Sequence, residues 1–134
     1  GAFWVFSFSK KKTEGLALYP TALQRAALLQ KTAFGGPLVM LNLLKFKNKE
    51  AYGGYAKSVK GVSSSFGIEF LFFGEVLTTV IGDTVSYHAI ALVKYPSIKA
   101  FIQFASSDSM KGFKKQREAG LEGQHLVAIK EVEF

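Results

Sequence analysis

The sequence has 134 residues, 49% of them hydrophobic, with 17 basic and 10 acidic side chains and no cysteine. This length fits one domain around one core. The lack of cysteine excludes a disulfide framework, a thiol nucleophile and a thiolate zinc site. No run of 18 apolar residues is present, so we expect no membrane-spanning helix and no membrane partner. The net charge of +7 comes from scattered lysines, which favours a solvated basic surface over a nucleic-acid site.

Residues 1–18 read as an N-terminal extension ahead of a single domain at 19–134. We interpret the extension either as a short strand at 2–8 or as a segment added by cloning. Its lysines follow the apolar run instead of preceding it, which argues against a secretory signal. We therefore expect a cytoplasmic protein.

The first predicted helix opens at Thr21, because Thr21 and Gln24 have the spacing of a capping box. It ends before the glycine pair at 35–36. Residues 37–46 follow as a strand that is apolar on both faces and interrupted only by Asn42. A strand without a polar face is typical of one that lies between two layers.

A second helix is expected from Asn48, which fits an N-cap, to Gly67, which fits a helix terminus. Residues 68–81 then read as one long strand with a bulge near Gly74. A turn leads to the next strand at 85–95, which is again apolar on both faces. Two of the predicted strands therefore lack a polar side.

A third helix is predicted after Ser97, followed by a further helical segment that Asp108 caps and that ends near Gly120. The last strand is expected at 125–132. The order βαββαβ predicts an α+β, ferredoxin-like domain with a four-stranded antiparallel sheet and an extra N-terminal helix. Since the helices cover one face of such a sheet, we expect a second copy of the chain to cover the other in a homodimer.

Three motifs resemble an uncharacterised bacterial domain family of the dimeric α/β-barrel superfamily, over about residues 19–131. They are MLNLLKFK from Met40, YPS ending at Ser97 and REAGL from Arg117. The resemblance implies a ferredoxin-like protomer whose sheet pairs with its twin. Enzymes of this superfamily include cofactor-free monooxygenases, small-ring isomerases and haem-handling enzymes, and many hold a ligand between helices and sheet. Tyr87-His88 stands where a Trp-Asp pair is frequent, so a role of that acid does not transfer.

Three residues are candidates for catalysis. Asn42 could orient a ligand carbonyl, or its amide could bond a neighbouring backbone. His88 could act as a general base, or it could be a hydrogen-bonded core residue. Glu75, expected at the bulge, could be a base in a cavity or a solvated carboxylate at a sheet edge.

Two further residues are candidates for ligand binding. Tyr55 is expected in the core with its hydroxyl open to a pocket. Arg117 could hold an anionic group, or pair with Glu118 or Glu122. No cluster of metal-ligating residues is recognisable, and neither histidine falls on a predicted helix as a haem ligand would. We therefore predict no metal and no cofactor.

These patterns predict a small homodimer that binds or transforms a small, partly apolar molecule in a pocket between helices and sheet. The alternative is a non-catalytic homodimeric accessory module, and the sequence leaves open whether any reaction occurs. RNA binding fits less well, since the aromatic sequence motif of an RNA-binding sheet is missing.

Overall fold

The computed structural model describes residues 15–83 and 87–133. The predicted strand at 2–8 therefore lies outside the described residues. The helices are α2 (Ala22–Gln30), α3 (Lys49–Ser63), α4 (Ile98–Ala105), α5 (Asp108–Gly112) and α6 (Lys114–Gly120), with short 3-10 turns at Lys31–Ala33 and Ser64–Phe66. The strands are β1 (Leu38–Phe46), β2 (Glu69–Glu75), β3 (Ala89–Tyr95) and β4 (Leu121–Ile129).

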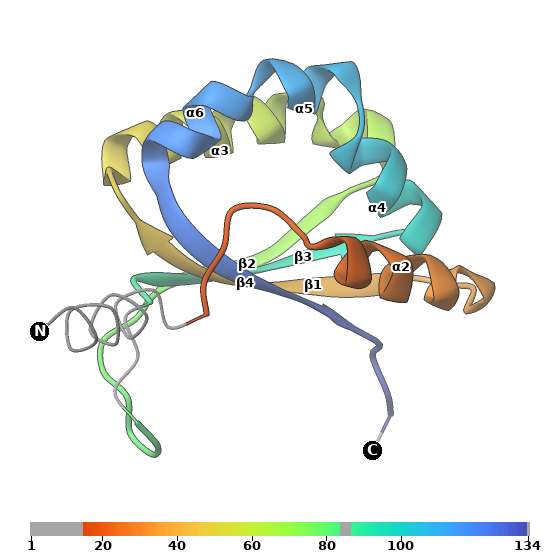
Figure 1. Cartoon of the computed structure of the whole chain (residues 1–134), viewed down its shortest axis with the longest axis horizontal. Helices are drawn as coiled ribbons and strands as arrows, with labels where there is room; N and C mark the ends of the chain where they lie inside the picture. The colour runs from red at the N-terminus through yellow and green to blue at the C-terminus, as the bar shows by residue number, and fades with distance from the viewer. Residues whose placement is uncertain (1–14, 84–86, 134) are drawn as a thin grey trace, which may run out of the picture.

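The four strands form one antiparallel sheet in the order β2-β3-β1-β4. Figure 1 shows α3 and the α4–α6 segment together above one face of this sheet. This is the ferredoxin-like α+β arrangement, so the predicted fold class is confirmed. Within the described residues, no helix is both long enough and apolar enough to cross a bilayer.

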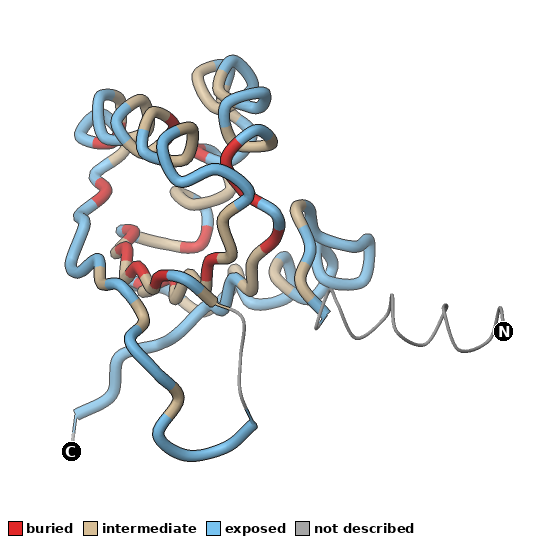
Figure 2. The backbone as a smooth tube through the Cα atoms, turned by 90° about the vertical axis from the view of Figure 1, so that its left-hand side faces the viewer, coloured by how far each residue is buried: buried red, intermediate tan, exposed pale blue. Residues whose placement is uncertain are grey.

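The core lies between the helices and the sheet, as the buried segments in Figure 2 show. Strand residues Leu38, Met40 and Val93 are buried there with Ile98 and Phe104 of α4. A smaller cluster at the other end joins three fully covered residues, Leu44, Ala89 and Leu121. We call this side of the sheet the inner face. In contrast, α2 buries none of its residues.

The opposite side of the sheet, the outer face, is apolar as predicted. Alternate residues of β1 point there, and the strand register places their neighbours in β3 and β4 beside them. These residues are Val39, Leu41 and Leu43 of β1, Ile90, Leu92 and Lys94 of β3, and His125, Val127 and Ile129 of β4, so the face is aliphatic except for Lys94 and His125. Figure 1 shows none of the labelled helices on this side. An apolar surface of this kind is typical of a contact with another protein surface.

The predicted helix termini are largely confirmed. Thr21 and Gln24 form a complete capping box, and the Asn48 side chain accepts a hydrogen bond from the Ala51 N–H. Gly67 ends the second helix with a φ of 70°, a left-handed conformation that favours glycine. The expected cap at Asp108 is wrong, because the Ser107 hydroxyl caps that helix and Asp108 is its first residue.

Two strand boundaries differ from the prediction. The strand expected at 68–81 ends at Glu75, and its register shift lies between Phe70 and Phe72, not near Gly74. Among the described residues, the Val76 N–H continues the ladder beyond Glu75 by a bond to the His88 carbonyl. The alternating apolar residues that follow Glu75 therefore resemble a strand in sequence but are not strand residues in the structure.

The other two strands are also displaced along the chain. The strand expected at 85–95 begins at Ala89 in the described residues, and β4 spans Leu121–Ile129 where 125–132 was expected. β4 starts directly after the last residue of α6, Gly120. The Gly120 carbonyl accepts hydrogen bonds from the N–H groups of Lys47 and Asn48. This contact joins the last strand to the start of α3.

Candidate functional site

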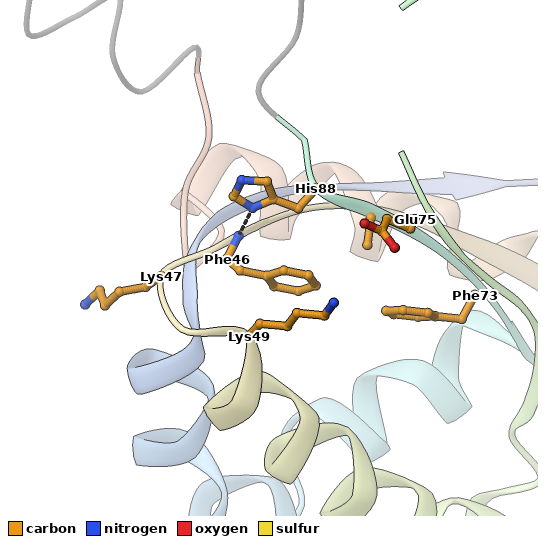
Figure 3. Close-up of a pocket in the computed structure, with 7 residues that line it drawn as sticks. Phe46, Lys47, Lys49, Phe73, Glu75 and His88 are labelled. Carbon is orange, nitrogen blue, oxygen red and sulfur yellow. Dashed lines mark hydrogen bonds between the residues drawn. The ribbon is translucent and has the colours of Figure 1, made fainter. Parts of the chain in front are cut away.

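An open pocket of about 530 Å3 lies at one end of the sheet. It forms where β1 and β2 end, where α3 begins, and where the chain enters β3. Its lining residues are Phe46, Lys47, Lys49, Phe73, Glu75, His88 and Ala89, six of which are labelled in Figure 3. Two predicted candidates, His88 and Glu75, therefore share one pocket although they are distant in sequence.

His88 is fixed at the rim of the pocket by three hydrogen bonds. Its N–H donates to the Leu44 carbonyl at 2.7 Å, and its carbonyl accepts from the Val76 N–H at 2.9 Å. Its side-chain Nδ1 accepts from the Phe46 N–H at 2.8 Å, as the dashed line in Figure 3 shows. Because Nδ1 uses its lone pair in this bond, the proton of the neutral imidazole sits on Nε2. His88 thus presents an N–H donor, and it is exposed, where enclosure was expected.

Aromatic rings form the apolar wall of the pocket. The rings of Phe46 and His88 stack with centroids 5.6 Å apart and an interplanar angle of 24°. Phe73 lies across from them on β2 with 60% of its surface exposed. Figure 3 shows the Phe46 and Phe73 side chains on the same side of the sheet, with open space between them. An exposed phenylalanine beside a hollow is a ready contact for an apolar ligand.

Charged side chains lie next to this wall. In Figure 3 the Lys49 side chain runs beneath Phe46 toward Phe73, whereas Lys47 points away from the pocket. Glu75, the last residue of β2, also lines the pocket. Among the described residues, neither Lys49 nor Glu75 has an ion-pair partner within 4.0 Å. One cation and one anion are therefore available to a bound molecule.

Asn42 lies in the middle of β1, away from the pocket lining. Its Nδ2 donates to the Met40 carbonyl at 3.3 Å and to the Ala91 carbonyl at 3.4 Å. Both partners are backbone groups, which is the second of the two roles expected for Asn42, a bond to the neighbouring backbone.

Tyr55 lies behind the pocket in a group of buried aromatic rings. Its ring is 5.6 Å from that of Tyr52, which in turn lies 4.9 Å from Phe46. Burial raises the pKa of the Tyr55, Tyr52 and Tyr95 hydroxyls. Tyr55 therefore contributes to the pocket through these neighbouring rings and is not itself one of its lining residues.

Arg117 lies outside the pocket lining as well. Its guanidinium group is 5.3 Å from the centroid of the Tyr19 ring, a cation–π contact. Of its two expected partners, Glu118 accepts a hydrogen bond from the Tyr19 hydroxyl and Glu122 pairs with Lys45 at 3.4 Å. Arg117 therefore contacts the Tyr19 ring, whereas an ion pair with a carboxylate was the expected structural role.

The second histidine, His125, belongs to a separate group in β4. Its Nδ1 bonds the Tyr87 hydroxyl, and its Nε2 lies 3.2 Å from the Gly15 carbonyl. In the part of the chain that the structure describes, no three acidic, histidine or cysteine side chains gather as they would around a metal ion.

Five pocket residues were not singled out as candidates from the sequence: Phe46, Lys47, Lys49, Phe73 and Ala89. Phe46 and Phe73 fitted the pattern of ordinary strand residues, and Lys49 that of an ordinary first helical residue. The available signal was their position at element ends, where chain segments converge and side chains can line a cavity.

The family is identified by residues 37–132, which match the domain of unknown function DUF1330. The chain belongs to this family. The match spans all four strands and their connecting helices, so the resemblance found in the sequence is confirmed. No curated protein is significantly similar to the chain.

Solved structures support the same fold. A protein of unknown function from Rhodopseudomonas palustris is 23% identical, with a TM-score of 0.78 over 86% of this chain and 96% of that one. A dabb family protein with a ferredoxin-like fold from Mesorhizobium loti is 12% identical (TM-score 0.55; 73% and 99% covered). A dimeric protein of unknown function with a ferredoxin-like fold from Bacteroides fragilis is 11% identical (TM-score 0.54; 73% and 99% covered). At these identities the similarity establishes the fold alone.

Proposed function

We propose that this protein is a homodimer in which each protomer binds a small, partly apolar molecule in the pocket at the end of β1. The observation that carries the proposal is the open space between Phe46 and Phe73, with Lys49, Glu75 and His88 around it. Pockets that combine an apolar wall with a few polar groups are the usual sites of small-molecule binding.

The side chains suggest how a ligand would be oriented. An apolar, flat part of the molecule would lie between Phe46 and Phe73. A carboxylate oxygen would lie close to the Lys49 ammonium group, which Figure 3 shows on the same side of the sheet as the two rings. We assign Lys49 as the group that binds the polar end of the ligand, the two phenylalanines as the groups that supply contact area, and His88 as the residue that positions Phe46 through its Nδ1.

The same arrangement supports chemistry without a cofactor. Glu75 is the carboxylate in the pocket that could accept a proton, and the Lys49 ammonium group is the cation that could stabilise a developing oxyanion. These roles suit removal of a proton next to a carbonyl group. One observation favours the alternative of a non-catalytic module. Among the described residues, the Asn42 amide group donates to two backbone carbonyls, as a structural residue would.

The homodimer is supported by the apolar outer face and by the dimeric ferredoxin-like relative from Bacteroides fragilis. Sheet-to-sheet pairing would remove this surface from water in both copies at once. The pocket opens at the end of the sheet and its aromatic wall lies on the inner face, so pairing leaves it accessible.

Binding can be tested with the fluorescent probe 8-anilinonaphthalene-1-sulfonate, which has an aromatic body and one anionic group. We expect a fluorescence enhancement that Phe73→Ser abolishes, and a probe affinity that Lys49→Gln lowers about 2- to 5-fold, the effect of one exposed charge. Lys57→Gln is the matched control, since Lys57 is an exposed lysine of the same helix. Equal probe affinity in all of these variants would contradict the proposed site.

A further inference from the structure

The connection between β2 and β3 carries three aliphatic side chains that are almost completely exposed. Leu77, Val80 and Ile81 expose 93%, 88% and 91% of their surfaces. Single exposed apolar residues are common on soluble proteins, but several together on one short segment are typical of a contact surface. We call residues 76–83 the arm.

The arm has a defined direction. Figures 1 and 2 agree that it leaves the sheet on the side away from the helices, which is the side of the outer face. Its base is held by the bond from the Val76 N–H to the His88 carbonyl at 2.9 Å. Near its far end Gly82 has a φ of 100°, which reverses the chain at a position that favours glycine.

We propose that the arm of one copy docks on the outer face of a second copy of this chain, so that the two arms clasp the dimer. This inference rests on the homodimer proposed above. A partner that pairs with the outer face would lie beside the arm, because both are on the same side of the sheet. Twofold symmetry would then produce the contact twice, once from each arm.

Charge favours a second copy as the occupant. The protein carries a net charge of +7, so two copies repel one another wherever their basic surfaces meet. From Val76 to Gly82 the arm contains no charged residue, and the outer face that it would meet is predominantly aliphatic. The one charged residue of the arm, Asp83, is negative, so the arm is suited to contact a surface of the same basic protein.

The arm also connects two residues of the pocket. Glu75 precedes it directly, and His88 lies just before the strand to which it returns. A docked arm would hold both of these residues in place. Dimer formation would therefore stabilise the geometry of the rim of the pocket.

The absence of cysteine from the chain permits a direct test. Ile81→Cys places a single thiol on the arm, and Leu23→Cys places one at a matched position that is 83% exposed on α2. Light scattering records the mass of each variant, and maleimide labelling records the reactivity of each thiol. We expect Ile81→Cys to react at least about tenfold more slowly in the dimer, because docking buries it.

The outcomes separate the arm from the dimer. A dimer in which both thiols react equally would overturn the arm proposal and leave the sheet-paired dimer intact. A monomer would overturn both. As a second measurement, Leu77→Ser combined with Ile81→Ser should weaken dimerisation by about 100-fold or more, whereas Leu23→Ser should leave it unchanged. Unchanged dimerisation in the double variant would also contradict the clasp.

Discussion

Gly120 offers the sharpest test of how the helices are placed over the pocket. A Cβ atom at this position would lie 2.4 Å from the Tyr52 backbone nitrogen and 2.6 Å from its Cα. These are backbone atoms of α3, so no side-chain rotation can relieve the contact. Gly120→Ala must therefore push α3 and the α6–β4 junction apart.

The cost can be worked from the contacts. Overpacking of this kind costs about 1–3 kcal/mol. The shift also strains the bonds from the Lys47 and Asn48 N–H groups to the Gly120 carbonyl, each worth about 1 kcal/mol. We expect a total loss of about 2–4 kcal/mol, which lowers Tm by about 6–15 °C in a domain of this size.

Gly61→Ala is the matched control, because the same atom is added to α3 where nothing lies within 4 Å. Alanine is the better helix former there, so we expect a gain of about 0.5–1 kcal/mol. Thermal unfolding followed by circular dichroism, at one fixed protein concentration, measures both variants. A Gly120→Ala protein that melts with or above the wild type would refute the close approach of α6 to α3.

Three further predictions concern the tyrosines, the outer face and α2. Burial raises the pKa of Tyr52 and Tyr95, so the stability that they contribute is complete below about pH 10, where unfolded tyrosine ionises. Above that pH we expect the free energy of unfolding, measured by urea denaturation, to fall by about 1.4 kcal/mol per pH unit for each of the two tyrosines. The fall should be smaller in the Tyr52→Phe variant. A free energy of unfolding that stays constant up to pH 12 would contradict this prediction. Leu41→Lys should yield folded monomers by light scattering, because it places a charge in the centre of the outer face, and an unchanged dimer would contradict that pairing. Thr21→Ala removes a helix cap worth about 1 kcal/mol, so it should speed amide hydrogen exchange in α2. It should leave Tm nearly constant, because α2 buries no residue. A large drop in Tm would contradict this and mean that α2 supports the core.

Element identity could be predicted from the sequence because it depends on local patterns. The capping box at Thr21 and the left-handed glycine at Gly67 are local signals, and the structure has both. The extent of β2 could not be predicted in this way, since a strand continues only where a neighbour pairs with it. Leu77 and Ile81 alternate as strand residues do, but they project from the sheet as part of the arm.

The candidate site could be predicted only in part. His88 and Glu75 were chosen for their chemistry, and the pairing of β2 with β3 brings them to one pocket. The bond between the Phe46 N–H and the His88 Nδ1 joins residues 42 positions apart, so no local pattern indicates it. That bond makes His88 a donor in its neutral form, where the sequence suggested a base. Lys49 was missed because a lysine in a first helical turn is usually a solvated charge.

The claim on which this account depends most is that a second copy of the chain covers the outer face of the sheet. Size-exclusion chromatography with light scattering on the wild-type chain at micromolar concentration tests it directly. We predict a single species with twice the mass of the 14.7 kDa protomer. A single species of 14.7 kDa that stays in solution would contradict the pairing, and with it the clasp.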